Sequence, residues 1–273
     1  MNVERVEEAL RHVGRRVPQP LQELVERAGR HQTMTLAAGL AFLGLVSLGP
    51  ALAVGMALLR GLTSPQTATA VVDALKATFP ETLGLADLIG QMEGQVGRYA
   101  GLSLVVLLWP ATSLASGWLR ALDAISEEEA TPALRGLVGR AKGLGLGLAL
   151  LAGFVLVVAT MVAGTAFAGR RAAALAGLLA VTPASLFVTC LALYRWFPSH
   201  RRRPWSLIWQ GAAWATAGVF VATIGFALGL TLAEQLAGHY PPSLSTAIVV
   251  GLWLYGANAC LLLGDEWNAL RAR

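Results

Sequence analysis

The stretch that decides the fold class is PWSLIWQGAAWATAGVFVATIGFALGLTLA, residues 204–233, which contains no Asp, Glu, Lys or Arg. A helix needs roughly 20 apolar residues to cross the hydrocarbon core of a bilayer, so this stretch is long enough. Five other stretches that lack these four residue types are also long enough: about 32–59, 99–119, 143–169, 172–194 and 235–264. The sequence therefore predicts an all-α integral membrane protein with six transmembrane helices.

Composition agrees with this class. Of the 273 residues, 55% are hydrophobic and 14% are charged, whereas a soluble domain usually carries about 25% charged residues. The length suits a single membrane domain. We place a cytoplasmic segment at 1–31, the membrane domain at 32–264 with its last span at 240–264, and a short tail at 265–273.

The positive charges are distributed unevenly along the predicted loops. If the N-terminus is cytoplasmic, 16 of the 21 Lys and Arg residues fall on the cytoplasmic side and five on the outer side. Such a bias sets the orientation of a multi-pass protein. We therefore expect a bacterial inner-membrane protein with both termini in the cytoplasm. The net charge of +5 is explained by this topology, and no nucleic-acid partner is expected.

Two regions outside the spans show helical amphipathicity. Residues 3–17 have apolar side chains at helical spacing and predict an interfacial helix on the cytoplasmic face, and a second short amphipathic piece covers residues 21–28. The long periplasmic loop, 60–98, has two apolar stripes separated by Pro80. It predicts two short helices that lie on the outer side of the bundle.

Prolines near the middle of three spans predict kinks, because each removes a backbone donor. These are Pro50, Pro110 and Pro183, and Ser47 and Ser113 lie near two of them. Carbonyls freed in a membrane need hydroxyl or water partners. The pattern fits either a wetted cavity at mid-depth or ordinary kinked helices satisfied by their own hydroxyls.

Charged residues occur at the ends of the second, fourth and sixth predicted spans. Spans two, four and six all end on the cytoplasmic side, and Arg120, Asp123, Arg195 and Glu266 lie near those ends. Because unpaired charges beside lipid are costly, we expect these four to come together. Such a cluster would act either as a static staple or as a lock on the inner side of the bundle.

The basic run Arg201, Arg202 and Arg203 follows span four. It is a candidate for contacts with anionic lipid headgroups. It also fits the general excess of positive charge in cytoplasmic loops. In a further interpretation, the run joins Arg120, Asp123, Arg195, Asp265 and Glu266 in an inter-helix ion network that closes the inner face.

The residues do not suggest an enzyme. The four His residues fall in different segments at no metal-ligand spacing, and no phosphate-cradling Gly loop with Lys and Ser or Thr is present. Cys190 and Cys260 lie within spans and predict small buried residues. We expect no cofactor and no metal.

Several strings resemble the YihY/virulence factor BrkB family over nearly the whole chain, in the family's order and spacing. They are AAGLAF at 37–42 with SLGP at 47–50, LW at 108–109 with RALD at 120–123, YRWFP at 194–198 with PW at 204–205 and GA at 211–212, LWLY at 252–255, and GDEWN at 264–268.

The resemblance implies six spans in a bacterial inner membrane. The family has carried a ribonuclease label, but this sequence offers no residues for that chemistry. Our leading hypothesis is a transporter or translocase for an amphiphilic or lipid-like solute, with membrane lipids as partners. The alternative is a structural or scaffolding membrane protein without cargo. The oligomeric state, including a homo-oligomer, stays open.

Overall fold

The computed structural model describes residues 18–62, 64–66, 69, 73, 113–114, 116–126, 171–196, 203–236 and 242–272. All regular structure in these ranges is helical, as predicted. The helices are α2 (Gln19–Arg30), α3 (Thr33–Leu62), α7 (Arg171–Trp196), α8 (Trp205–Leu236) and α9 (Pro242–Arg271), together with a helical segment at 116–125.

Four of these helices occupy stretches predicted as spans. Among the described residues, Trp205–Phe226 and Ala247–Arg271 are long and apolar enough to cross a membrane, and Thr33–Ser47 forms a shorter apolar helix. The predicted spans at 99–119 and 143–169, the helix at 3–17 and most of the loop 60–98 lie outside the described residues.

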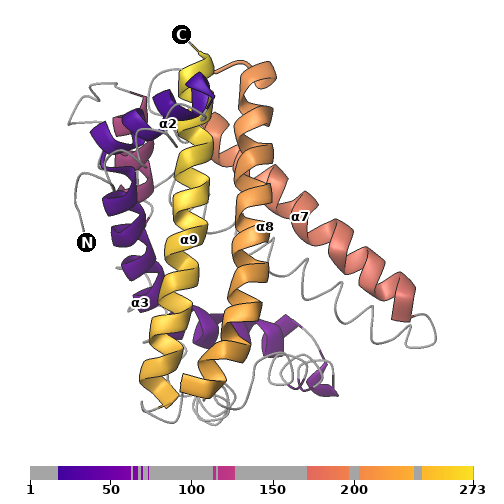
Figure 1. The fold of residues 1–273 in the computed structure, drawn as a ribbon. Helices are drawn as coiled ribbons and strands as arrows, with labels where there is room; N and C mark the ends of the chain where they lie inside the picture. Colours follow the sequence, from indigo (N-terminus) through magenta and orange to yellow (C-terminus); the bar gives the residue numbers. More distant parts are fainter. Residues whose placement is uncertain are drawn as a thin grey trace.

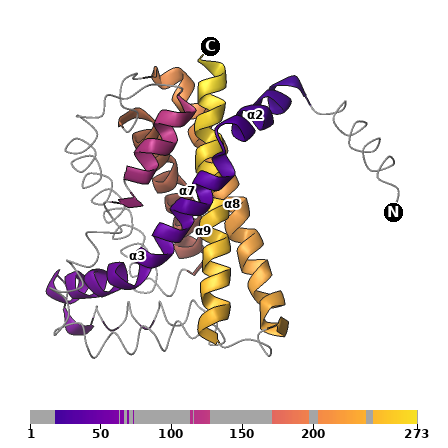
Figure 2. The same ribbon diagram turned by 90° about the vertical axis from the view of Figure 1, so that its left-hand side faces the viewer.

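Helices α8 and α9 run side by side, and α3 packs on the other side of α9 (Figures 1 and 2). Helix α7 meets α8 near its own C-terminal end and diverges from it toward its N-terminal end (Figure 1). Short α2 lies beside the C-terminal end of α9. The C-terminal ends of α7 and α9 and the N-terminal end of α8 thus lie together, and we call this region the packed end.

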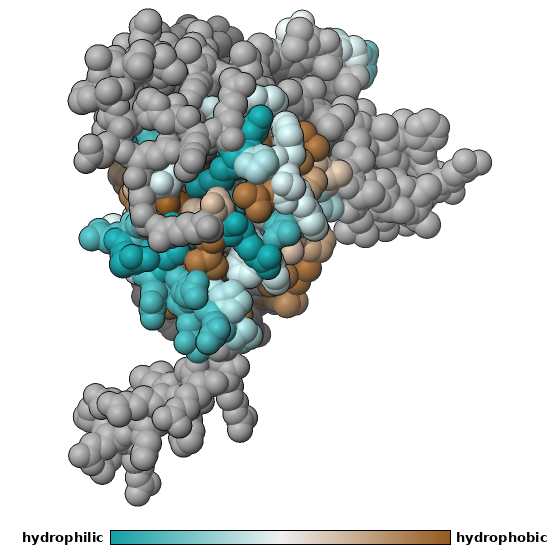
Figure 3. Space-filling model, turned by 90° about the horizontal axis from the view of Figure 1, so that it is seen from above, coloured by the Kyte–Doolittle hydropathy of each residue, from teal (hydrophilic) through white to brown (hydrophobic). Residues whose placement is uncertain are grey.

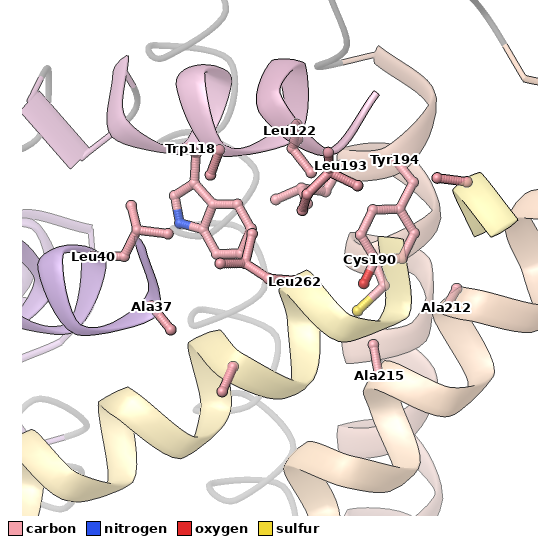
Figure 4. Packing of buried hydrophobic residues seen from close by; sticks show 14 of the residues in the cluster. Ala37, Leu40, Trp118, Leu122, Cys190, Leu193, Tyr194, Ala212, Ala215 and Leu262 are labelled. Atoms are coloured by element: carbon pink, nitrogen blue, oxygen red, sulfur yellow. The ribbon is translucent and has the colours of Figure 1, made fainter. Parts of the chain in front are cut away.

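The hydrophobic core lies at the packed end. Trp118 and Leu122 of the helical segment 116–125 pack over Leu262 of α9, and Leu40 of α3 lies beside them (Figure 4). Tyr194 and Cys190 of α7 fill the space next to α8. Cys190 is buried, as predicted, and Cys260 is half-buried. Trp118 is also buried in this core.

Helices α8 and α9 approach each other closely through glycines. A Cβ atom on Gly211 would lie 2.1 Å from the carbonyl oxygen of Gly264, and one on Gly264 would lie 2.6 Å from the Tyr194 hydroxyl. Only a hydrogen fits at these two positions, because real Cβ atoms do not come so near to backbone oxygens. Small residues of this kind let helix backbones touch in a membrane. This close crossing fixes where the acidic residues of α9 are placed.

A candidate functional site: the buried charges at the packed end

Two adjacent carboxylates, Asp265 and Glu266, are fully buried on α9. Neighbouring residues on a helix point about 100° apart, so the two side chains face different neighbours. Burying a charge is expensive unless it is paired and hydrogen-bonded. Each carboxylate has its own arginine, supplied by a different and distant part of the sequence.

Glu266 is held by the corner where α2 meets α3. Its Oε2 atom lies 3.3 Å from Nε of Arg27. Its Oε1 atom lies 2.6 Å from Nδ1 of His31 and accepts a 3.1 Å hydrogen bond from the Thr33 hydroxyl. Both carboxylate oxygens therefore have partners. Arg27 also donates through Nη2 to the carbonyl of Ile125, at 3.2 Å, which ties the helical segment 116–125 to the same corner.

The geometry of this corner explains why three side chains reach one carboxylate. Helix α2 begins after Pro18, and Pro20 lies in its first turn, where a missing backbone donor costs nothing. It ends at Arg30, and Gln32 adopts a left-handed backbone conformation with φ of 53° before α3 starts at Thr33. Because such a φ is uncommon outside glycine, it indicates a corner held by its surroundings. The turn directs Arg27, His31 and Thr33 toward α9.

Asp265 is held by the chain just before α8. Nη1 of Arg203 lies 2.5 Å from Oδ1 of Asp265, and its Nη2 donates to the Ser126 hydroxyl at 2.9 Å. Arg195 of α7 donates in turn to the carbonyl of Arg203. Oδ2 of Asp265 is buried and has no hydrogen-bond partner among the residues that the structure describes. Asp265 is thus less completely satisfied than its neighbour Glu266.

Asn268, one turn further along α9, ties it to α8. Its Oδ1 atom accepts a 2.9 Å hydrogen bond from the backbone N–H of Gly211. The Tyr194 hydroxyl donates to the carbonyl of Leu261, at 2.5 Å, and so ties α7 to α9.

Viewed onto this end, hydrophilic residues gather on the described surface, with hydrophobic residues toward its edge (Figure 3). The result is a polar network joining every described helix at one end of the bundle.

The four residues of the predicted charge cluster are placed differently from one another. Glu266 is buried in the network, and Arg195 joins it through the carbonyl of Arg203. Asp123 is buried on the helical segment 116–125. Arg120 is exposed, and its Nε donates to the carbonyl of Ser116 in its own helix. The ion pairs of Glu266 in the described part of the chain are with Arg27 and His31.

The three arginines predicted to contact lipid headgroups also differ in how the structure describes them. Arg201 and Arg202 lie outside the described residues. Arg203 is 7% exposed and pairs with Asp265, so its guanidinium serves the protein interior and is not available to a lipid headgroup.

The described kink positions are not members of these ion pairs. Ser47 is buried, and its hydroxyl donates to the carbonyl of Leu43, as expected for a helix that satisfies itself. Pro50 lies inside α3. Pro183 lies inside α7 and is half-buried. Ser113 is half-buried, and its carbonyl accepts from the Ser116 hydroxyl. Pro110 lies outside the described residues.

Sequence reasoning missed the roles of Arg27, His31 and Thr33. They were assigned to a cytoplasmic segment and to the first residues of a span, and no local spacing links them to Glu266. Two features of the sequence could have indicated these roles. Arg27 stands among the apolar residues of the 21–28 piece. Asp265 and Glu266 are adjacent acidic residues at the end of a predicted span, and two buried carboxylates require two cationic partners.

These features define a helical protein with long apolar helices and a network of buried charges at one end. The comparisons agree with this class: the family model described as Virulence factor BrkB matches residues 24–273, and the chain belongs to that family. The predicted resemblance is thereby confirmed. A search of curated proteins and a search of solved structures found no match.

Proposed function

We propose that this protein is a multi-pass inner-membrane translocase for an amphiphilic or lipid-like solute, with six spans and cytoplasmic termini. The observation that carries the proposal is a gradient of packing along the bundle. Side chains are buried and paired at one end, and they become exposed and apolar toward the other. The packed end would close the cytoplasmic side, where span ends and basic residues meet.

The gradient is clearest in α8. Five of its residues between 208 and 219 are buried: Ile208, Gly211, Ala212, Ala215 and Val219. From Phe220 to Gly229 the residues whose burial is described are all exposed or half-buried. Helix α7 repeats the pattern, because Cys190, Leu193 and Tyr194 are buried while residues 182–189 are not.

The loosely packed half suits an amphiphile because its exposed surface is apolar and uncharged. Val188, Val221, Leu228 and Leu252 each expose more than half of their surface there. Apolar surface of this kind accommodates hydrocarbon chains, while a polar headgroup would meet charge only near the ends of the bundle. Translocation would then require the loosely packed half to change its arrangement while the packed end holds the helices together.

The experiment is reconstitution into vesicles that carry a fluorescent phospholipid, with chemical quenching of the outer leaflet over time. We expect the protected fraction of label to fall faster than in empty vesicles or in vesicles with heat-inactivated protein. A panel of lipids and single-chain amphiphiles should show a preference. If no member moves above the empty vesicles while the protein is monodisperse and folded, the proposal is wrong, and a scaffolding role accounts better for the network of charges.

A further inference from the structure

Helix α2 presents three different arcs around its axis. Arg27 and Ala28 are buried against the bundle, and Leu24 is half-buried beside them. Leu21 and Val25 are apolar but exposed, at 41% and 69%. The remaining arc is polar or small and exposed: Gln22, Glu23, Glu26, Gly29 and Arg30. At 100° per residue, the exposed apolar flank lies between the buried arc on one side and the polar arc on the other.

This arrangement is that of a helix lying at a membrane surface. A helix that only packs on a soluble protein has a single apolar stripe facing the core. Here the apolar sector is wider than the buried one, and the excess is occupied by two large side chains one turn apart. A helix in the headgroup region needs such a flank to face the acyl chains, with a polar arc to face water.

Neighbouring residues point to lipid as the occupant of this flank. Helix α3, which follows α2 in the chain, also carries exposed apolar side chains, namely Met34, Phe42 and Val46. At the packed end, where α2 lies, Trp196, Trp205 and Trp209 are all exposed. Exposed Trp residues gather at the headgroup level of membranes, so α2 lies at the depth where an interfacial helix is expected.

We propose that α2 is a membrane-surface latch, in which Leu21 and Val25 insert at the headgroup–acyl boundary while Arg27 and His31 hold Glu266 at the end of α9. The two contacts belong to one short helix of 12 residues. Helices shorter than about 12–15 residues are marginal on their own, so each contact stabilises the helix that the other needs. Contact with lipid and the hold on α9 are therefore coupled.

The proposal does not depend on translocation, since it concerns only how one end of the bundle is fixed. In this proposal, weakening the contact of α2 with lipid also weakens its ion pair with Glu266. Weakening the ion pair likewise weakens the contact of α2 with lipid.

The experiment places a single bimane fluorophore on α2 of the full-length protein in nanodiscs. Val25→Cys and, as a matched control one residue away on the polar arc, Glu26→Cys are labelled in a background carrying Cys190→Ala and Cys260→Ala. Nanodiscs contain phospholipid with a nitroxide quencher near the top of the acyl chain, and iodide serves as the quencher in water. We expect lipid quenching at position 25 and iodide quenching at position 26.

Coupling is tested by adding Glu266→Gln, or in a second variant Arg27→Gln, to the label at position 25. Because either change removes one partner of a buried ion pair, we expect lipid quenching at position 25 to fall by roughly half. Size-exclusion profiles and the lipid quenching of a bimane at the exposed site Phe42→Cys verify that each variant remains folded in the nanodisc.

Three outcomes would overturn the proposal. Equal lipid quenching at positions 25 and 26 would mean that the helix has no lipid-facing flank. Protection of position 25 from both quenchers would mean that residues 1–17 or a second copy of the chain covers it. Unchanged lipid quenching at position 25 in both the Glu266→Gln and Arg27→Gln variants would mean that the lipid contact and the hold on α9 are independent.

Discussion

Neither half of α8 carries a charged residue before Glu234, but the two halves differ in how they are packed. The half from Trp205 to Val219 touches backbone, buried tyrosine and paired charges, and a methyl group added at Gly211 finds no room. In the half that follows, a methyl group added at Gly225 would meet nothing within 4 Å. The comparison teaches that internal packing and ion pairs specify one end of this bundle, whereas exposed apolar side chains characterise the described part of the other end.

The largest effect should follow the loss of the Glu266 carboxylate. Glu266→Ala removes the buried carboxylate that Arg27 contacts at 3.3 Å, and breaking a buried ion pair costs about 3–5 kcal/mol of folding free energy. Glu26→Ala, which removes an exposed carboxylate from α2, is the matched control and should change stability by less than about 0.5 kcal/mol. Denaturant titration in mixed micelles measures both. Equal effects of the two variants would mean that the packed end is not held by this pair.

A methyl group added to α8 should have opposite effects in its two halves. Gly211→Ala forces the α8–α9 crossing apart, because its Cβ would lie 2.1 Å from the Gly264 carbonyl oxygen, and should destabilise by about 3 kcal/mol. Gly225→Ala meets no neighbour and gains helix propensity, so it should stabilise by roughly 0.5–1 kcal/mol. Thermal unfolding in the same detergent compares them. If both variants destabilise, the two halves are packed alike.

Coupling energies should distinguish the ion pair that the structure contains from the one that sequence reasoning expected. In a double-mutant cycle, Arg27→Ala and Glu266→Ala should be non-additive by about 1–3 kcal/mol, because they remove the same contact. Arg120→Ala and Glu266→Ala should add to within about 0.5 kcal/mol, since Arg120 is exposed and bonds within its own helix. A larger coupling for Arg120 than for Arg27 would contradict the described network.

The smallest effect concerns a single neutral hydrogen bond at the packed end. Tyr194→Phe removes the hydroxyl that donates to Leu261 and should destabilise by about 0.5–1.5 kcal/mol. Tyr255→Phe is the control, because Tyr255 is only half-buried and its hydroxyl makes no hydrogen bond within the described part of the chain. Thermal unfolding measures the loss of stability in both variants. If Tyr255→Phe destabilises the protein as much as Tyr194→Phe does, the hydrogen bond between α7 and α9 has no particular importance for stability.

The sequence predicted the helical class, the family and the positions of α3, α7, α8 and α9, because an uncharged stretch of membrane length has few other structures open to it. It also predicted a cluster of Arg120, Asp123, Arg195 and Glu266, but Glu266 pairs with Arg27 of α2, while Arg120 is exposed and bonds within its own helix. Hydropathy and charge are local properties, and these conclusions depend on nothing else.

The partners within the network could not be predicted in the same way. Arg120 and Arg27 are equally charged, and only the corner at Gln32 and the tight α8–α9 crossing decide which of them meets Glu266. Arg203 stands in a run of three arginines that are indistinguishable by sequence, so its pairing with Asp265 could not be assigned from the sequence. Such choices depend on contacts between segments far apart in the chain.

The most direct test of the central claim is a pair of distance distributions between nitroxide spin labels, measured by pulsed electron paramagnetic resonance in nanodiscs. One pair, on Trp196 and Trp209, joins α7 and α8 at the packed end; the other, on Thr182 and Gly225, joins them in the loosely packed half, and all four sites are exposed. Both pairs use a background without Cys190 and Cys260. The account predicts a narrow distribution for the first pair and a broad or two-component distribution for the second. Equally narrow distributions would contradict it and favour a rigid scaffold.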